Sequence, residues 1–522
     1  IMRIVMSCLF LLYVATTYGQ QLRGINVNSV QFSTPNNANI QMLHATGVDV
    51  IRLSFGYAPL MSRTPPYKFV PEAFERLENA LDFCEVNDIK VIVDPHTTPG
   101  TASKYTMSPT DSFWIDTVKQ KLLYKLWDTL SIVLVNRGDV IYGLDLMNEP
   151  YIPCCDVNLW NNIAKRITDT IRANGNTHPI ILEPFGHVDG QGNYINRINS
   201  IPLLDLPLDS NLMLSPHFYA PFAFTHQGVD GAPTGYHYPA VINGVMYDST
   251  KLASLMQPIK DFATAHPTIK INLGEFSAAR VGGTDGNVWV EDVVGIAEGE
   301  GWDWAYHEFR GSPVWDPEMP VGSNNSMPRD TNEYRMQFLM KKFRLTKVIL
   351  PIEYILLYGN PHPGGVSLSW DISDDGQLST IELQRSRDGR NFETVTHWTK
   401  ENKGNIPTYY WDPIDSSTKL YYRLKVVGSD GRPQYSSVIV VHSTGDNAFY
   451  VYPSLAHDEI KISFDKTADI REIIVFDIHG NVVHKIMPNV SQTIVNIQVS
   501  DLQPGIYFVS CGDEVTKFIK SK

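Results

Sequence analysis

The stretch Ile141-Tyr142-Gly143-Leu144-Asp145-Leu146-Met147-Asn148-Glu149-Pro150 is an apolar run that closes on a glutamate. The stretch Ile269-Lys270-Ile271-Asn272-Leu273-Gly274-Glu275-Phe276, far downstream, has the same form. Short apolar runs bounded by turn-forming residues are typical of buried strands. Both glutamates are therefore expected where a buried strand ends.

Similar runs recur on either side of these two. From residue 22 to about 343, short apolar runs alternate with longer helical patterns, which predicts a parallel sheet covered by helices. Helices are expected at 71–87, 111–136, 157–174 and 331–343. The candidate strands begin at Leu22, Val48, Ile89, Ile141, Pro179, Asn211, Ile269 and Trp302. Eight strands with intervening helices predict an α/β fold, a (β/α)₈ barrel over residues 20–345.

Composition excludes several kinds of partner. The chain has 522 residues, too many for one core, so several domains are expected. A formal net charge of -13 argues against nucleic acid or an anionic membrane as partner. No Cys/His spacing suggests zinc, and no phosphate loop or dinucleotide fingerprint is found, so neither a metal nor a cofactor is expected. A monomer is expected.

The first residues predict a signal peptide over 1–19. Arg3 precedes a short apolar stretch that ends near Val14, and the small residues Thr17 and Gly19 suit cleavage near Gln20. Few cysteines remain beyond this segment, too few for a disulfide framework. Among them, Cys154-Cys155 could form a vicinal disulfide or remain thiols.

Polar side chains gather at the predicted strand ends. In a (β/α)₈ barrel the active site lies at the carboxyl ends of the strands. Two carboxylates there can hydrolyse a bond by protonating a leaving group with one and attacking with the other. Asp94, Asp145 and Glu183 lie in or near strand ends and are interpreted as structural. The candidate site residues at strand ends are Arg52, His96, Asn148, Glu149, His217, Tyr219, Glu275 and Trp304.

The barrel resembles glycoside hydrolase family 5, the family of cellulases, mannanases and related retaining glycosidases. The matching pieces, in order, are Arg52 in Val-Ile-Arg-Leu, His96 in Asp-Pro-His, Asn148-Glu149-Pro150, His217-Phe218-Tyr219 and Gly274-Glu275-Phe276. The resemblance implies that Glu149 is the acid/base, that Glu275 is the nucleophile and that Asn148 binds the sugar 2-hydroxyl.

The surrounding residues are expected to tune these carboxyls. Arg52 and Tyr219 would keep Glu275 ionised, and the Glu275 charge would raise the pKa of Glu149 so that it stays protonated. His96 and His217 would hold sugar hydroxyls and the carboxylates in place. Many family members have a tryptophan at the end of strand eight that forms the floor of the cleft. In this chain that position falls near His307, so Trp304 or Trp315 is expected to serve instead.

Beyond residue 345 the sequence pattern changes to short β-type runs, which predicts two small β-sandwich domains. Residues 346–445, with Gln384-Arg385-Ser386-Arg387-Asp388-Gly389, resemble a fibronectin type III module. Residues 446–522 resemble the C-terminal sorting domain of the type IX secretion system, through Val451-Tyr452-Pro453 and Gln503-Pro504-Gly505. The type IX machinery would then be a partner, and the protein would be secreted or attached to the cell surface.

The resemblance implies a secreted retaining β-glycosidase acting on a polysaccharide. An endo-β-1,4-glucanase is favoured by the stretch from Tyr219 to Gly228. A β-mannanase or a β-1,3-glucan-acting enzyme is the alternative on the same site. A non-catalytic surface glycan-binding protein, which belongs to a different functional class, remains an alternative. Such a protein has no need for both Glu149 and Glu275.

Overall fold

A computed structural model describes most of the chain between residues 21 and 520. The signal peptide expected at 1–19 and the pair Cys154-Cys155 lie outside the described residues. The segments left out are 1–20, 34–37, 99–111, 154–155, 323–327, 345–353, 363–364, 374–377, 400–406, 415–418, 429–432, 443–448, 453–454, 457, 465–471, 478–479, 489–493, 513 and 521–522.

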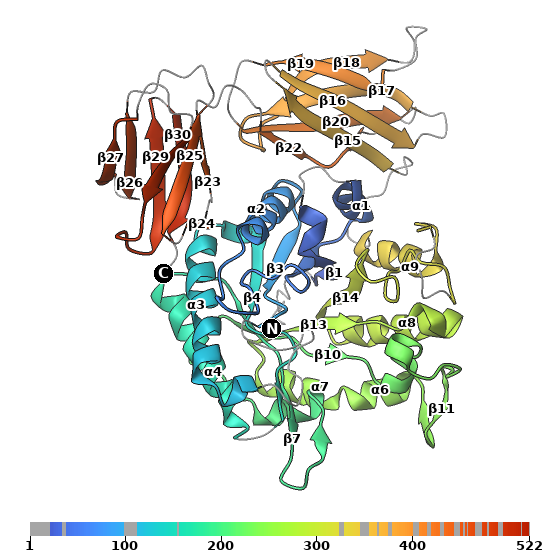
Figure 1. The fold of residues 1–522 in the computed structure, drawn as a ribbon. Coiled ribbons are helices and arrows are strands. Elements are labelled where there is room, and N and C mark those ends of the chain that lie inside the picture. The colour runs from blue at the N-terminus through green and yellow to red at the C-terminus, as the bar shows by residue number, and fades with distance from the viewer. Residues whose placement is uncertain are drawn as a thin grey trace, which may run out of the picture.

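The first part of the chain folds as a closed parallel barrel (Figure 1). Its strands are β1 (Arg23–Asn28), β2 (Val50–Ser54), β3 (Lys90–Asp94), β4 (Ile141–Asp145), β6 (Ile180–Leu182), β9 (Leu212–Leu214), β13 (Lys270–Phe276) and β14 (Asp303–Phe309). They pair in that order, and β13 pairs with both β9 and β14 to close the ring. The short β10 (His217–Phe218) follows β9 and lies beside the end of β13. The predicted (β/α)₈ barrel is confirmed.

Helices surround the barrel between its strands (Figure 1). Their bounds are α1 (Ala38–Thr46), α2 (Pro71–Val86), α3 (Thr117–Leu134), α4 (Asn158–Ala173), α5 (Phe222–Thr225), α6 (Ser249–Leu255), α7 (Gln257–Ala265), α8 (Gly283–Gly299) and α9 (Tyr334–Phe343). Helix α3 begins later than the sequence predicts because the Asp116 carboxylate accepts from the N–H groups of Val118 and Lys119 and caps it. Among the described helices, none combines the length and the apolar character needed to cross a bilayer.

Three buried tryptophans fix helices to the strand ends that carry the candidate site. Trp127 of α3 donates to the carbonyl of Leu146, and Trp160 of α4 donates to that of Glu183. Trp289 of α8 donates to the carbonyl of Ala220. Each indole buries a large apolar surface and also satisfies a backbone acceptor that irregular structure would leave unpaired. The loops after β4, β6 and β10 are thereby held on the helix layer.

A small sheet lies beside the loops after β4 and β6. It contains β5 (Tyr151–Ile152), β7 (Gly186–Val188) and β8 (Tyr194–Ile195), and β7 projects from the barrel at the lower edge of Figure 1. The segment between β10 and α6 forms the hairpin of β11 (Ala240–Ile242) and β12 (Val245–Tyr247). Both insertions extend the edge of the barrel at which its strands end.

Further β-sheets follow the barrel, as expected. One group pairs β15 with β16 and β19 in one sheet, and β17, β18, β20, β21 and β22 in a second. A second group divides β23 to β30 between two sheets. Bounds are β15 (Tyr354–His362), β16 (Gly365–Ser373), β17 (Leu378–Ser386), β18 (Glu393–Thr399), β19 (Tyr409–Pro413), β20 (Lys419–Gly428), β21 (Pro433–Tyr435), β22 (Ile439–His442), β23 (Phe449–Tyr452), β24 (Leu455–Ala456), β25 (Glu459–Phe464), β26 (Ile473–Asp477), β27 (Val482–Ile486), β28 (Ile494–Gln498), β29 (Gly505–Cys511) and β30 (Glu514–Lys520). The fibronectin type III assignment of the first group stays a prediction.

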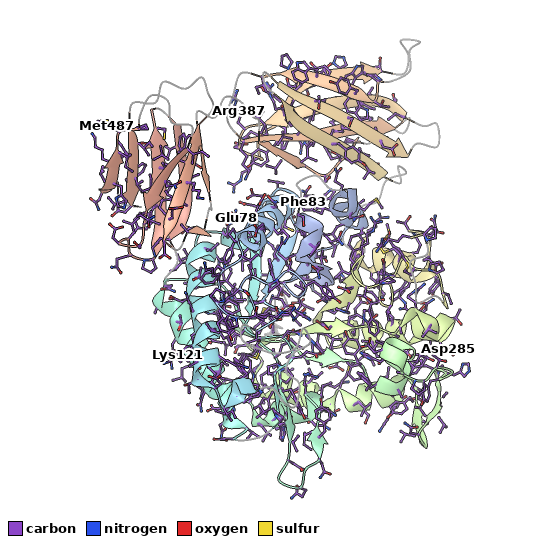
Figure 2. The ribbon with its side chains drawn as sticks, viewed as in Figure 1. Glu78, Phe83, Lys121, Asp285, Arg387 and Met487 are labelled. Atoms are coloured by element: carbon purple, nitrogen blue, oxygen red, sulfur yellow. The ribbon has the colours of Figure 1, made fainter. Side chains whose placement is uncertain are left out.

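The sheets formed by β15 to β22 contact helices α1 and α2 of the barrel. Asn87 exchanges two hydrogen bonds with the backbone of Val438, and Gln41 does so with Leu357. Figure 2 shows Phe83 of α2 on the side of the barrel next to these strands. The contact lies away from the strand ends that carry the candidate site, so it leaves them open.

Candidate active site

An open cleft lies at the carboxyl ends of the barrel strands. It is lined by the predicted residues His96, Asn148, Glu149, His217, Tyr219 and Glu275, and by residues that the sequence did not single out as site residues, including Tyr57, Arg197, His226 and Glu308. These predicted residues come from four different strand ends, those of β3, β4, β10 and β13. Closure of the barrel is what brings them together.

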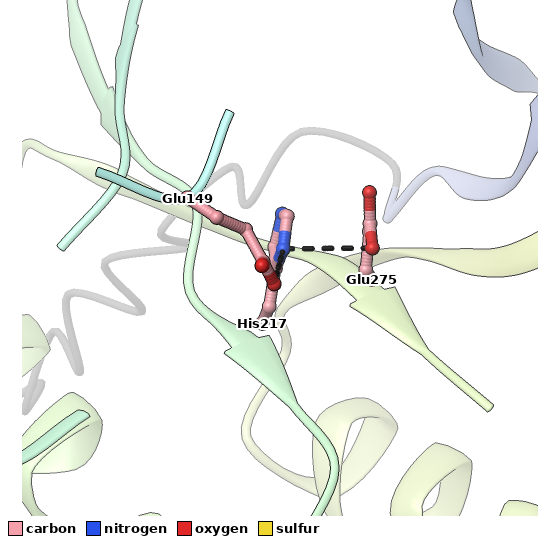
Figure 3. Close-up of side chains that lie close together, drawn as sticks. All are labelled: Glu149, His217 and Glu275. Atoms are coloured by element: carbon pink, nitrogen blue, oxygen red, sulfur yellow. Dashed lines mark hydrogen bonds and ion pairs between the residues drawn. The ribbon is translucent and has the colours of Figure 1, made fainter. Parts of the chain in front are cut away.

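Glu149 and Glu275 lie on either side of His217 (Figure 3). His217 Nδ1 is 3.0 Å from Glu149 Oε1 and 3.6 Å from Glu275 Oε2. One side-chain oxygen from each glutamate and a ring nitrogen of His217 all lie within 4.8 Å of one another. The two predicted carboxylates therefore face one shared space.

Strand pairing and a glycine allow this approach. His217 and Glu275 are register partners on the paired strands β10 and β13. A Cβ atom at Gly274 would lie 2.2 Å from Ser215 Oγ and 3.2 Å from His217 Nε2. Any larger residue at position 274 would displace the Ser215 side chain and press on His217, so the glycine lets the Glu275 carboxylate sit beside the imidazole.

Glu149 has a backbone conformation that aims its side chain. Its φ is 47°, in the left-handed region that residues other than glycine seldom adopt. The Glu149 N–H donates to Glu183 Oε2 at 2.7 Å, and Arg197 donates to the Glu149 carbonyl at 3.2 Å. These contacts compensate for the strained backbone and fix the direction of the carboxylate.

Arg52 lies under the floor of the cleft, fully buried among carboxylates. Its side chain also donates to Asn148 Oδ1 at 2.9 Å. Its four acidic partners are Glu275 Oε1 at 2.6 Å, Asp145 Oδ2 and Glu183 Oε1 at 2.9 Å each, and Asp94 Oδ2 at 3.0 Å. The acids interpreted as structural thus neutralise Arg52 and orient it, which is consistent with their expected role. Arg52 itself does not line the cleft.

Glu275 is held ionised by its surroundings. Burial alone would raise the pKa of its carboxyl, but His217, His307, Arg52 and His96 together outweigh burial and lower the pKa well below the usual value. Tyr219 also donates a hydrogen bond to Glu275 Oε2 at 3.1 Å. The expectation that Arg52 and Tyr219 support an ionised Glu275 agrees with these contacts.

The expected raised pKa of Glu149 is wrong. Burial and the nearby Glu275 charge do raise it, but Arg197 and the hydrogen bond from His217 outweigh them and lower the pKa of Glu149 to about 2. Burial also works to lower the pKa of His217, and its carboxylate neighbours raise it well above 6.5. The shared proton therefore resides on His217, hydrogen-bonded to Glu149.

His96 and Asn148 form the other side of the site. His96 Nδ1 lies 2.8 Å from Asp94 Oδ2, and its Nε2 lies 3.3 Å from the Asn148 side-chain nitrogen. Burial lowers the pKa of His96, but Asp94 and Glu275 raise it to about 9. Asn148 is thus anchored by Arg52 and lies beside His96, with its side chain at the cleft surface.

Trp304 is not a sugar-binding residue, contrary to the prediction. Its side chain is 0% exposed and packs against Phe276 of β13 and Phe343 of α9, on the face of β14 that contacts the helices. Trp315, the alternative, lines the cleft and lies edge-on to His226, with ring centroids 4.9 Å apart. His307 also lines the cleft, and its Nδ1 is 3.7 Å from Glu275 Oε2.

Arg197 and His226 were missed by the sequence reasoning. Neither follows directly from a barrel strand. His226 lies within the stretch Tyr219 to Gly228 but was not named as a site residue, and no motif marks Arg197. Burial lowers the pKa of His226 to about 4, so this ring is neutral and stacks on Phe222 at 3.8 Å between centroids. The available signal was a polar insertion after a barrel strand, but such an insertion does not indicate which of its residues reaches the cleft.

Glu149, His217 and Glu275 are spaced so that they could ligate a metal ion. Metal binding requires a neutral imidazole. The raised pKa of His217 places a proton on its ring at neutral pH, where it acts as a cation between the carboxylates. The arrangement suits proton transfer better than metal ligation.

Comparison with known families identifies this arrangement. Residues 13–310, more than half of the chain, match the model "Cellulase (glycosyl hydrolase family 5)". The chain belongs to glycosyl hydrolase family 5. The family assignment makes the protein a glycoside hydrolase and agrees with the closed barrel and its strand-end carboxylates.

Curated relatives of the barrel are distant. Endoglucanase C of Acetivibrio thermocellus is 21% identical over 286 residues, which cover 50% of this chain and 79% of that protein. Cellodextrinase A of Ruminococcus flavefaciens is 24% identical over 195 residues, covering 37% and 54%. A probable glucan 1,3-beta-glucosidase A of Emericella nidulans is 30% identical over 119 residues, covering 22% and 28%.

Solved structures share the fold. A crystal structure described as a glycoside hydrolase superposes with a TM-score of 0.50 at 18% identity, covering 62% of this chain and 100% of that one. An endoglucanase structure gives a TM-score of 0.46 at 20% identity, covering 62% and 96%. At these identities the likeness concerns the barrel fold alone.

The end of the chain matches a second family. Residues 450–521 match a secretion system C-terminal sorting domain, as the sequence predicted. This domain directs proteins through the type IX machinery, so the protein is secreted or attached to the cell surface.

Proposed function

We propose that this protein is a retaining endoglycosidase that cleaves internal β-1,4 bonds of glucans. The observation that carries the proposal is the approach of Glu149 and Glu275, whose side-chain oxygens lie within 4.8 Å. Retaining glycosidases hold their carboxyl groups about 5 to 5.5 Å apart, whereas inverting enzymes need about 6.5 to 9.5 Å to admit a water. The spacing favours direct attack by a carboxylate.

In this mechanism Glu275, held ionised, attacks the anomeric carbon, and the bond to the leaving sugar breaks. Glu149 protonates the leaving oxygen with the proton shared in its hydrogen bond to His217. The donated proton comes from His217 by way of Glu149, which is again a carboxylate once the leaving oxygen is protonated. Glu149 then takes a proton from water, which attacks the glycosyl-enzyme and releases Glu275. Asn148 accepts a hydrogen bond from Arg52 and lines the cleft with the two glutamates, where it can bind the sugar 2-hydroxyl.

Aromatic residues on both sides of the cleft support the endo mode. Tyr57, after β2, is 62% exposed, and Phe222, after β10, is 66% exposed, and both line the cleft. Strands β2 and β10 lie on opposite sides of the barrel. A glycan chain can therefore run past the carboxylates in both directions and contact an aromatic face at each end. The relatives named endoglucanase support a glucan as the substrate.

The test is a product profile on purified cellulose, mixed-linkage glucan, xyloglucan, glucomannan, mannan and laminarin. Oligosaccharides of several lengths from a β-1,4-linked glucan are expected early in the reaction. Faster release from mannan would reject the glucanase assignment in favour of a mannanase. Absence of release from every polysaccharide would instead favour a non-catalytic glycan-binding protein.

A β-1,3-glucan-acting enzyme is the second candidate, because the relatives include proteins named glucan 1,3-beta-glucosidase. Laminarin, a β-1,3-glucan, separates the two. Faster hydrolysis of laminarin than of any β-1,4-linked glucan would favour the second candidate.

The stereochemical outcome tests the mechanism independently of the substrate. Proton NMR of the first product from a β-linked substrate should show the β-anomer. Initial formation of the α-anomer would mean that Glu275 activates water, and the retaining mechanism would be wrong.

We also propose that three parts of the chain have different functions. Residues 20–345 carry catalysis, residues 346–445 act as a fibronectin-like spacer, and residues 446–522 serve export. The protein is proposed to act as a monomer, which light scattering of the purified protein tests.

A further inference from the structure

Arg197 holds Glu149 at two points. Its Nη2 lies 3.2 Å from Glu149 Oε2 and 3.2 Å from the Glu149 carbonyl oxygen. Its Nε is buried and has no hydrogen-bond acceptor among the described residues. Arg197 therefore contacts the Glu149 carboxylate at Oε2, whereas His217 contacts it at Oε1.

The small sheet beside the cleft fixes this arginine. Gly186 of β7 donates to the carbonyl of Pro150, which directly follows Glu149. A Cβ atom at Gly186 would lie only 3.1 Å from ring atoms of Tyr151 and Tyr194, so the two rings close over this glycine. Tyr194 belongs to β8, and Arg197 comes two residues after that strand ends. The sheet thus ties the segment that bears Arg197 to the loop that bears Glu149.

We propose that Arg197 is a positioning residue that clamps the Glu149 carboxylate against His217 and sets the alkaline pH limit of catalysis. This inference rests on the proposed function, in which Glu149 supplies the proton to the leaving group. Because the guanidinium stays charged at all working pH values, it acts as a constant positive charge beside the acid/base.

The charge balance around Glu149 gives the direction of the effect. An opposite charge within about 4 to 6 Å lowers a carboxyl pKa by roughly one to three units. Arg197 favours loss of the shared proton, whereas the anions around Glu149 favour its retention. The other titratable groups facing Glu149 are His217, Tyr219, Glu275, Glu183, Tyr194 and the neutral His226. Removing Arg197 leaves His217 as the principal cation and makes the shared proton harder to lose.

The experiment measures kcat/KM against pH on the polysaccharide that the wild-type protein hydrolyses fastest. In Arg197→Gln and Arg197→Met, the alkaline limb should move to higher pH by at least about one unit. Arg197→Lys keeps the positive charge and should keep its limb close to that of the wild type. Lys165→Gln, which removes one charge from the exposed ion pair between Lys165 of α4 and Asp205, is the matched control and should not move the limb.

A substrate with a good leaving group separates this role from a purely structural one. A 4-nitrophenyl β-glycoside needs little protonation, so its alkaline limb should move much less in Arg197→Gln. Equal changes on both substrates, or an unmoved limb on the polysaccharide, would overturn the proposal. So would loss of folded protein in both neutral variants, because Arg197 would then be a structural anchor. An inactive wild-type protein would instead reject the proposed function.

Discussion

Arg52 Nη1 lies 2.6 Å from Glu275 Oε1, with the guanidinium fully buried and the carboxylate almost so. Low exposure makes this attraction strong, but it also makes each charge costly without the other. The same arginine contacts three further carboxylates beneath the cleft. Arg52 therefore supports the charge of the proposed nucleophile and the packing of the barrel interior together.

Glu149→Ala and Glu275→Ala should each abolish most turnover, because one removes the proton donor and the other the nucleophile. General acid–base catalysis alone accounts for roughly 10² to 10⁴-fold. Hydrolysis rates and circular dichroism measure activity and folding, with Glu291→Ala on α8, outside the cleft, as the control. Activity within about tenfold of wild type in a folded variant would refute the assignment. Azide should partly restore Glu149→Ala on a substrate with a good leaving group.

Arg52→Met should destabilise the barrel by roughly 3 to 5 kcal/mol, because it leaves buried carboxylates without their cation. The midpoint of denaturant unfolding, followed by tryptophan fluorescence, measures the change. Lys165→Met breaks the exposed pair with Asp205 and should cost no more than about 1 kcal/mol. Equal effects of the two substitutions would contradict the buried-cluster account.

Stability should depend on pH in two windows. The raised pKa of His96, about 9 against 6.5 unfolded, gives a contribution that is complete below pH 6.5 and is lost as pH rises toward 9. It amounts to about 3 kcal/mol at most. The lowered pKa of Glu149, about 2 against 4.5, gives a contribution that is present above pH 4.5 and is lost as pH falls toward 2.

Thermal unfolding across pH checks both windows, and the highest midpoint is expected between pH 4.5 and 6.5. His96→Gln should flatten the alkaline decline. His237→Gln, which alters an exposed histidine, should leave it unchanged. An alkaline decline of the same size in His96→Gln would show that other groups cause it.

Trp315→Ala should weaken polysaccharide binding, since Trp315 lines the cleft and can stack on a sugar. A rise in KM of roughly tenfold corresponds to about 1.4 kcal/mol. Trp304→Phe is the comparison, because Trp304 lies in the packed interior. It should lower the unfolding midpoint and leave KM unchanged. The reverse pattern would restore Trp304 as the sugar-binding residue.

Removal of residues 446–522 should leave turnover intact and prevent export. The match to a sorting domain covers this segment, and the proposed catalytic residues all lie in the barrel. Turnover is measured on truncated protein made in the cytoplasm, and location is measured in the native host. Appearance of the truncated protein outside the cell at the normal level would show that the segment is dispensable for sorting.

The sequence alone determined the barrel and its strand-end glutamates. Strands covered by helices on one face and by barrel interior on the other must be apolar along their length, so they stand out as short runs. Each described barrel strand begins within two residues of its expected start. Because parallel strands end at one face, their order alone placed Glu149, Glu275, His96 and His217 together.

Only the tertiary structure decided which side chains share that face and which charges they meet. Trp304 is the second residue of β14, and its side chain lies against α9, since successive residues of a strand point to opposite faces. Arg197 reaches Glu149 through an insertion that no periodicity marks. The pKa of Glu149 falls because of that contact and its bond to His217, and the sign of such a shift depends on distances of a few ångströms between residues far apart in the chain.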